Sequence, residues 1–242
     1  RKEFPRIAVI IVETSSVIIL DGDDPDLPVW MVFQNSGYGN MLGELTNKSV
    51  YMLNGQIALG CFPYDLYVAD FILDTGWSFS TGTIGGDYFG NISERNIGSA
   101  RADNESWSFG TTTIIGNRYI KKVTMGVLPN SPINPITKLP EPAIAIGTNV
   151  GVTLLRGKYS GKSEYSSNSN WQASDALAFS DEGGLWYSTM YNSVMHAFTL
   201  GYIPPEVIAS GQNYTTQDIY NGGNEDHPQW RYGKVWSATW PE

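Results

Sequence analysis

Short apolar runs broken by polar turns recur along this chain. Residues 143–155 (AIAIGTNVGVTLL) and 176–189 (ALAFSDEGGLWYST) each consist of an apolar run, a polar turn that contains glycine, and a second apolar run. Ile146 and Phe179 take equivalent places in the two stretches, 33 residues apart (179 − 146). A strand–turn–strand unit that recurs after a few tens of residues indicates a repeat fold built from β-structure.

Two related stretches lie upstream and point to the same fold class. Residues 17–33 (VIILDGDDPDLPVWMVF) and 50–61 (VYMLNGQIALGC) repeat the unit, with Leu20 and Leu53 again 33 residues apart (53 − 20). We predict an all-β fold: a β-propeller-like array of antiparallel three- to four-stranded blades, about five in number, with a β-sandwich as the alternative. A single domain is expected over residues 1–242, and the absence of Met at its start suggests an excerpt of a longer chain.

Individual segments carry more local predictions. Residues 7–13 are rich in β-branched side chains and predict a strongly buried strand, the first of three consecutive antiparallel strands. Asn54 and Gly55 predict a type I′ hairpin turn. Residues 78–104 are poor in apolar side chains and predict a long surface excursion. Residues 129–142 contain five prolines and predict a rigid linker between blades.

The composition narrows the classes of function. Charged residues make up 16% and hydrophobic residues 41%, which is typical of a globular protein. The net charge of −9 disfavours nucleic acid as a partner, because phosphate binding needs a basic surface. No run approaches the ~20 apolar residues of a membrane helix, so we expect no membrane insertion. Cys61 is the single cysteine; it excludes an internal disulfide and is expected to be buried.

Four carboxylates form the densest acidic cluster in the sequence. Asp21, Asp23, Asp24 and Asp26 share one short loop, and hard cations such as Ca²⁺ prefer several oxygen ligands on a loop. Pro25 interrupts any likeness to an EF-hand, and a solvated hairpin turn is the alternative interpretation. Apart from this candidate calcium site, we expect no cofactor.

Aromatic side chains in or beside loops are the candidate binding residues. Exposed aromatic faces stack on sugar rings or fill pockets of a partner protein. The alternative is that these rings cover strands and the gaps between blades. The candidates are Trp77, Tyr88, Phe89, Trp107 and Trp171.

The sequence offers no recognisable catalytic constellation, and we assign no catalytic residue. His196 and His227 are the two histidines, and no nucleophile-elbow or phosphate-loop motif accompanies them. A zinc site is improbable with one cysteine and two separated histidines. A carboxylate pair for glycoside hydrolysis has no support from spacing, because a propeller would gather such a pair from distant loops. We therefore expect a protein that is not an enzyme.

Several long motifs resemble a family of virion structural proteins of tailed bacteriophages from marine bacteria. They include FPRIAVIIVETSSVIILDGDDPDLPVWMVF, LTNKSVYMLNGQIALG, DLYVADFILDTG, ISERN, VLPNSPINPITKLPEPAIAIGTNVGVTLL and ALAFSDEGGLWYST. The resemblance spans about residues 4–190 and weakens towards the C-terminus. It implies a location in the virion, in the tail or its fibres.

The resemblance implies a non-enzymatic assembly scaffold that also takes part in recognising the host surface. Its expected partners are other virion proteins and a host cell-surface glycan, and a cyclic homo-oligomer fits a fibre. Binding is expected from the loops of residues 75–104 and 157–170. Two alternatives stay open: a glycan-active β-propeller enzyme that resembles a glycoside hydrolase or lyase, and a free-standing carbohydrate-binding propeller.

Overall fold

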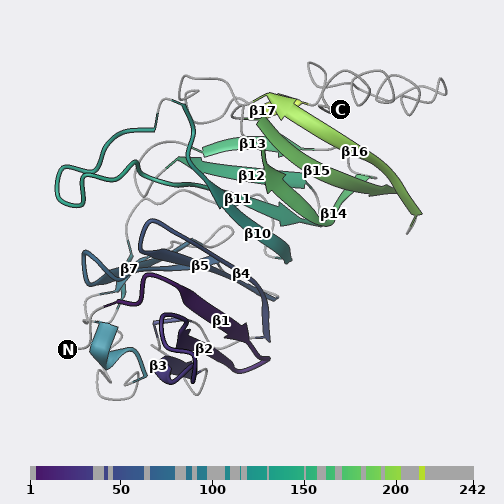
Figure 1. Cartoon of the computed structure of the whole chain (residues 1–242). Helices are drawn as coiled ribbons and strands as arrows, with labels where there is room; N and C mark the ends of the chain where they lie inside the picture. The colour runs from purple at the N-terminus through teal and green to yellow at the C-terminus, as the bar shows by residue number, and fades with distance from the viewer. Residues whose placement is uncertain are drawn as a thin grey trace, which may run out of the picture.

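The computed structural model is all-β (Figure 1). Its helical element in the described residues is a short 3₁₀ turn, η1 (Ile92–Glu94), and no helix there is long and apolar enough to span a membrane. The structure describes residues 4–34, 41–42, 46–62, 66–79, 86–88, 92–96, 107–109, 115, 119–129, 131–149, 151–156, 162–166, 171–180, 184–191, 194–202 and 213–215.

Two antiparallel sheets are formed by the first half of the chain. In each sheet, strands that are consecutive in sequence are neighbours. Sheet I contains β1 (Ala8–Val12), β2 (Ser16–Asp21) and β3 (Val29–Gln34). Sheet II contains β4 (Thr46–Leu53), β5 (Gln56–Phe62), β6 (Leu66–Asp70), β7 (Thr75–Phe79), β8 (Gly86–Tyr88) and β9 (Trp107–Phe109).

The second half forms two more sheets with the same sequential order. Sheet III contains β10 (Ile120–Gly126), β11 (Ala143–Thr148), β12 (Gly151–Arg156) and β13 (Lys162–Ser166). The short β17 (Asn213–Thr215) is added to the edge of sheet III, parallel to β13. Sheet IV contains β14 (Trp171–Phe179), β15 (Gly184–Tyr191) and β16 (Val194–Tyr202).

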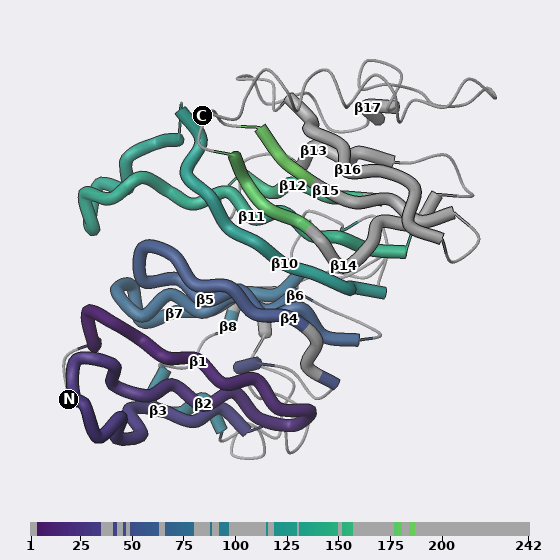
Figure 2. The backbone as a smooth tube through the Cα atoms, turned by 45° about the vertical axis from the view of Figure 1, so that its right-hand side comes forward, coloured from purple at the N-terminus to yellow at the C-terminus, as the bar shows by residue number. Residues whose placement is uncertain are grey.

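The sheets are stacked in the order I to IV (Figure 2). A separate hydrophobic cluster fills each space between successive sheets. The cluster between sheets I and II includes Val17, Ile19, Phe33, Ile57, Leu59, Cys61 and Ala69. The cluster between sheets II and III includes Ala58, Val68, Trp77, Ile120, Val123, Met125, Ile144 and Ile146. The cluster between sheets III and IV includes Ala143, Ala145, Val152, Leu154, Leu177 and Leu185.

Strands of the two middle sheets are apolar on both faces. In β5, Ile57 and Leu59 contact sheet I while Ala58, between them, belongs to the cluster shared with sheet III. In β11, Ile144 faces sheet II and Ala145 faces sheet IV. Successive side chains of a strand point to opposite faces, so a strand covered on both sides must be apolar at consecutive positions. This explains the unbroken apolar runs of the sequence.

The first strand of each sheet contacts the first strand of the next sheet, and β10 and β14 also contact the second strands of the preceding sheets, β5 and β11. β1 contacts β4, β4 contacts β10, and β10 contacts β14. Between β4 and β10, the buried Oγ of Ser49 accepts a hydrogen bond from the N–H of Val123 at 3.0 Å. A polar link inside an apolar interface is tolerated here because both groups are satisfied.

An aromatic cluster extends the interface between sheets I and II. The ring centroids of Phe4 and Trp30 are 5.0 Å apart, and those of Trp30 and Phe71 are 5.5 Å apart, and both pairs are edge-to-face. Phe33 joins through Phe71 at 6.2 Å. The cluster therefore fixes the N-terminal lead-in and β3 against the turn that joins β6 to β7.

Several local predictions are confirmed. Residues 7–34 form three consecutive antiparallel strands, and Asn54 and Gly55 have the positive φ values, 50° and 78°, that a type I′ turn requires. Cys61 is fully buried. These features depend on short-range pattern and turn chemistry, which the sequence carries directly.

Two local predictions are wrong. The segment of residues 129–142 joins β10 to β11 within sheet III, and is not a linker between sheets. It forms its own hairpin-like loop, in which the N–H of Asn134 donates to the carbonyl of Leu139 at 2.9 Å. β1 is partly buried on one face, through Ala8, Ile10 and Val12, and exposed on the other, where Val9 and Ile11 are 38% and 42% exposed.

The 33-residue spacing does not relate equivalent strands. Ile146 lies on the second strand of sheet III, whereas Phe179 ends the first strand of sheet IV. Leu20 and Leu53 are related in the same way, by a second and a first strand. The spacing therefore marks a repeated hairpin and is not the period of the sheets. Four sheets are present in the described residues, against about five expected blades, and within those residues they do not close into a ring or barrel.

Gly60 gives a direct test of the packing between sheets II and III. A Cβ at this buried position would lie 2.5 Å from Cγ2 of Ile120 and 2.7 Å from Cγ2 of Val123. We expect Gly60→Val to lower the free energy of unfolding by about 1–3 kcal/mol through overpacking. Urea denaturation followed by circular dichroism measures this change. Ala178→Val, at an exposed position of β14, is the control and should stay close to wild type; equal midpoints for the two variants would contradict this packing.

Candidate functional site

The acidic cluster forms the turn between β2 and β3 and is organised by its own hydrogen bonds. Oδ1 of Asp21 accepts from the N–H of Asp23 at 3.0 Å, and Oδ1 of Asp24 accepts from the N–H of Asp26 at 3.0 Å. The N–H of Leu27 donates to the carbonyl of Asp24 at 2.9 Å, and Leu27 has a φ of 47°. Carboxylates that accept from the N–H two residues later are typical of Asx turns, so these groups stabilise the loop.

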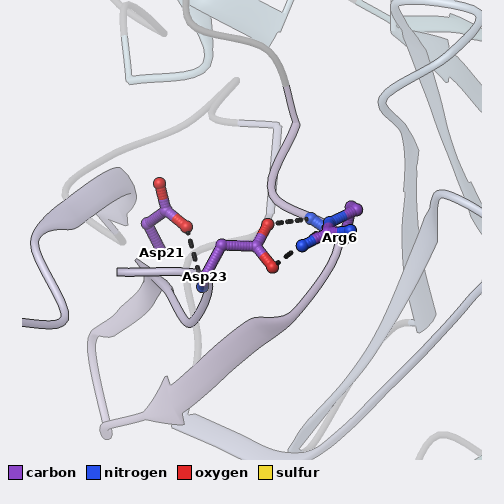
Figure 3. A network of polar contacts seen from close by, with 3 residues as sticks. All are labelled: Arg6, Asp21 and Asp23. Carbon is purple, nitrogen blue, oxygen red and sulfur yellow. Dashed lines mark hydrogen bonds and ion pairs between the residues drawn. The ribbon is translucent and has the colours of Figure 1, made fainter. Parts of the chain in front are cut away.

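Arg6 lies against the same turn (Figure 3). Its backbone N–H donates to Oδ2 of Asp23 at 2.7 Å, and its Nε lies 3.5 Å from Oδ1 of that carboxylate. The Arg6 side chain is 89% exposed, and an exposed pair of this kind contributes little to stability because water screens it. The guanidinium nevertheless adds a positive charge beside the Asp23 carboxylate, and this charge disfavours the binding of a cation at the turn.

In the part of the chain that the structure describes, no three His, Cys, Asp or Glu side chains converge as a metal site would require. The four carboxylates therefore lie on one loop but do not converge on a common point where a metal ion could bind. Calcium at this turn stays a prediction from the sequence, and the contacts of the turn supply the simpler role of closing a hairpin.

Two of the five candidate aromatic residues lie in the interior. Trp77 is 6% exposed in the cluster between sheets II and III, and Tyr88 is 3% exposed between sheets I and II. The hydroxyl of Tyr88 donates to the carbonyl of Glu94 at 3.2 Å. Rings this deeply buried present no face to a sugar, which agrees with the alternative that they cover strands.

The structure describes only the backbone of Trp107 and Trp171 and does not describe Phe89. Trp107 is the first residue of β9, paired with Tyr88, and Trp171 is the first residue of β14. Their side chains lie outside the described part of the structure, as does the whole of Phe89. A binding role for these three residues stays a prediction.

A pair of side-chain hydrogen bonds that the sequence did not predict lies at the free edge of β3. The side-chain amide of Asn96 donates from Nδ2 to the carbonyl of Val32 at 3.0 Å and accepts at Oδ1 from the N–H of Gln34 at 2.7 Å. These two backbone groups lie on the side of β3 that faces away from β2. One side chain thus satisfies the edge groups that a further strand would otherwise pair.

Arg95, the preceding residue, strengthens the same contact. Its Nε donates to the carbonyl of Val32 at 2.6 Å, and its guanidinium carbon lies 5.5 Å from the centroid of the Phe33 ring. Nη1 also donates to the carbonyl of Ile92 at 3.3 Å. Burial lowers the pKa of Arg95 from its usual value, yet a guanidinium remains charged at neutral pH. We call residues 92–96 the edge clamp.

The edge clamp is itself anchored in the core. Ile92 is fully buried, and its N–H donates to Oδ1 of Asp74 at 2.9 Å. The carbonyl of Arg95 accepts from the N–H of Met41 at 3.1 Å. The prediction that residues 78–104 form a surface excursion is therefore wrong for this part. A buried aliphatic residue followed by a polar pair is too weak a signal to find such a contact from sequence.

Comparisons with known proteins add little. No protein-family model matches the sequence, and no curated protein matches it. One similar solved structure is the extracellular domain of the one component system BT4673 from B. thetaiotaomicron, with 12% identity, 81% of this chain and 25% of that chain covered, and a TM-score of 0.34. Another, described as the extracellular domain of the hybrid two component system BT4673, has 11% identity, coverages of 91% and 32%, and a TM-score of 0.30. The chain thus spans about a quarter to a third of those structures, and TM-scores this low bear on neither fold nor function.

A substitution that replaces the amide nitrogen of Asn96 by an oxygen tests the edge clamp. Asn96→Asp keeps the acceptor for Gln34 but replaces the donor to the Val32 carbonyl by a carboxylate oxygen, so we expect a loss of about 1–3 kcal/mol in unfolding free energy. Asn134→Asp is the matched control, because Oδ1 of Asn134 accepts hydrogen bonds from the N–H groups of Ile136 and Thr137, and the substitution keeps this acceptor. Urea denaturation of both variants measures the difference, and an equal loss in the two would argue against the clamp.

The acidic turn can be tested with calcium. Because its carboxylates already accept hydrogen bonds and Arg6 supplies a positive charge, we expect the melting temperature in Ca²⁺ to differ by less than about 2 °C from that in chelator. Differential scanning calorimetry with and without chelator measures this. A stabilisation of several degrees that disappears in an Asp21→Asn/Asp24→Asn variant would establish a calcium site at the turn.

Proposed function

We propose that the four sheets are consecutive blades of an open β-propeller arc. In support, each sheet is a meander of sequentially adjacent strands, and the first strands of successive sheets contact one another. A propeller brings the first strands of its blades towards a common axis. A sandwich accounts less well for a third and a fourth sheet stacked in sequence order.

We infer that the protein is a non-enzymatic structural component of a phage virion, in the tail or its fibres. The observation that carries this proposal is the position of the motifs that resemble virion structural proteins. ISERN is the edge clamp, and the long motif of residues 127–155 forms the hairpin-like loop together with β11 and β12. These motifs build the scaffold: their described contacts close an edge and fill an interface. Other virion proteins are then its expected partners.

Recognition of a host glycan is the less supported part of the proposal. With Trp77 and Tyr88 in the core, it depends on the side chains of Trp107, Trp171 and Phe89. No contact among the described residues favours a glycan-active enzyme or a free-standing glycan-binding propeller.

The virion proposal predicts where the protein is found. Peptides of the chain should be recovered by mass spectrometry from density-purified phage particles, in amounts comparable to other tail proteins. The control is the particle-free fraction of the same lysate, in which enzymes released by lysis remain. Recovery from the particle-free fraction alone would reject a virion component and favour a free protein.

A further inference from the structure

The hairpin turn between β4 and β5 contains a chemically labile pair, Asn54-Gly55. Asparagine is thermolabile, and it reacts most readily before glycine, because no side chain hinders the glycine nitrogen. That backbone nitrogen attacks Cγ of the asparagine, a five-membered imide forms, and ammonia leaves. Water then opens the imide at either carbonyl and gives aspartate or isoaspartate. The overall reaction consumes water, releases ammonia and involves no change of oxidation state.

The conformation of the turn opposes this reaction. Asn54 has a φ of 50° and therefore lies in the left-handed region, where ψ is also positive. With this ψ, the nitrogen of Gly55 lies on the side of the Cα–C bond opposite to Cβ of Asn54, out of reach of Cγ. Closure of the imide requires the nitrogen on the same side as Cβ. The main chain of Asn54 must therefore rotate out of the turn before the nitrogen can attack.

Contacts on both residues hold the turn in this conformation. Nδ2 of Asn54 donates to the carbonyl of Pro140 at 2.8 Å, and the carbonyl of Gly55 accepts from the N–H of Phe71 at 2.9 Å. The side chain of Ile72 lies over Gly55, since a Cβ at that glycine would be 2.7 Å from Cδ1 of Ile72. Rotation about the Cα–C bond of Asn54 moves the whole Gly55 peptide. It therefore breaks the bond to Phe71 and the contact with Ile72.

The Asn54 amide also links sheet II to the loop of residues 129–142. This loop joins β10 to β11 and projects from sheet III at the left of the view (Figure 1). In aspartate or isoaspartate, a carboxylate oxygen replaces the donor Nδ2. A carboxylate and a carbonyl can only accept, so the two oxygens repel each other. Conversion of Asn54 therefore removes the hydrogen bond between the turn and Pro140.

We propose that Asn54 is a deamidation site that the folded turn protects, and that its conversion detaches the loop of residues 129–142 from sheet II. The reaction is spontaneous and is not reversed by refolding of the turn. Each conversion thus records one opening of the turn and leaves a lasting change in the loop. The chemistry uses water and residues of the turn alone, so it does not depend on a role in the virion.

Incubation of the full chain at mildly alkaline pH, in buffer and in guanidinium chloride, tests the protection. Peptide mass spectrometry measures the conversion of Asn54 and separates aspartate from isoaspartate. We expect conversion at least about tenfold slower in buffer, because only the small population of opened turns reacts there. The chain's other Asn-Gly pair, Asn221-Gly222, provides the reference in guanidinium chloride, where both pairs should react alike. Equal rates for Asn54 in the two solvents would overturn the proposal.

Truncation of Ile72 tests whether the contacts of the turn provide this protection. Ile72→Ala uncovers Gly55 and should speed the conversion of Asn54 in buffer severalfold, with no change in guanidinium chloride. Ile72 is 48% exposed, so its truncation leaves the core intact. Ile11→Ala is the matched control, because Ile11 is also an exposed aliphatic residue but lies on the face of β1 away from sheet II. Equal rates in the two variants would contradict protection by these contacts.

Tryptic cleavage after Lys138 measures the release of the loop. The N–H of Lys138 donates to the carbonyl of Asn134 at 2.9 Å inside the loop. Asn54→Asp carries the carboxylate of the product, and in this variant cleavage after Lys138 should be faster than in wild type by about threefold or more. Cleavage after Arg6, whose side chain is 89% exposed, is the internal reference and should not change. An unchanged rate after Lys138, or an equal rise at both sites, would show that the loop is not released.

Discussion

The structure depends on burying both faces of its two middle sheets. Sheets II and III each contribute to two hydrophobic clusters, so consecutive side chains such as Leu59 and Ala58, or Ile144 and Ala145, must all be apolar. Each fully buried aliphatic side chain contributes about 1.5–3 kcal/mol, and β-strands deliver them at every position when both faces are covered. The close approach of sheets II and III then leaves no room for a side chain at Gly60.

The hydrophobic pattern predicts the elements better than their arrangement. Strand positions and the turn at Asn54-Gly55 follow from residues that are adjacent in sequence, so the sequence alone predicts them. The 33-residue spacing of Ile146 and Phe179 is a property of hairpins, and a hairpin can be any two neighbouring strands of a sheet. Prolines exclude a central strand in residues 129–142, but they say nothing about whether the connection stays within one sheet.

For the candidate site, too, the sequence predicts the local element but not the contacts between distant residues. The four Asp residues lie in a turn as predicted, but whether carboxylates converge depends on loop conformation and on Arg6, 17 residues from Asp23. Trp77 and Tyr88 are buried because a large ring fills the space between two sheets as readily as it binds a ligand. The contacts of Asn96 with Gln34 join residues 62 apart, and no local pattern encodes a contact of that range.

The edge clamp also sets an order of events during synthesis. The three strands of sheet I are complete once residue 34 has been made, yet the amide that closes the edge of β3 is supplied 62 residues later. At about 5–20 residues per second, ribosomal elongation leaves that edge open for roughly 3–12 s. For this interval the nascent chain presents a largely apolar strand with an unpaired edge, and neighbouring nascent chains on one polysome can add to it.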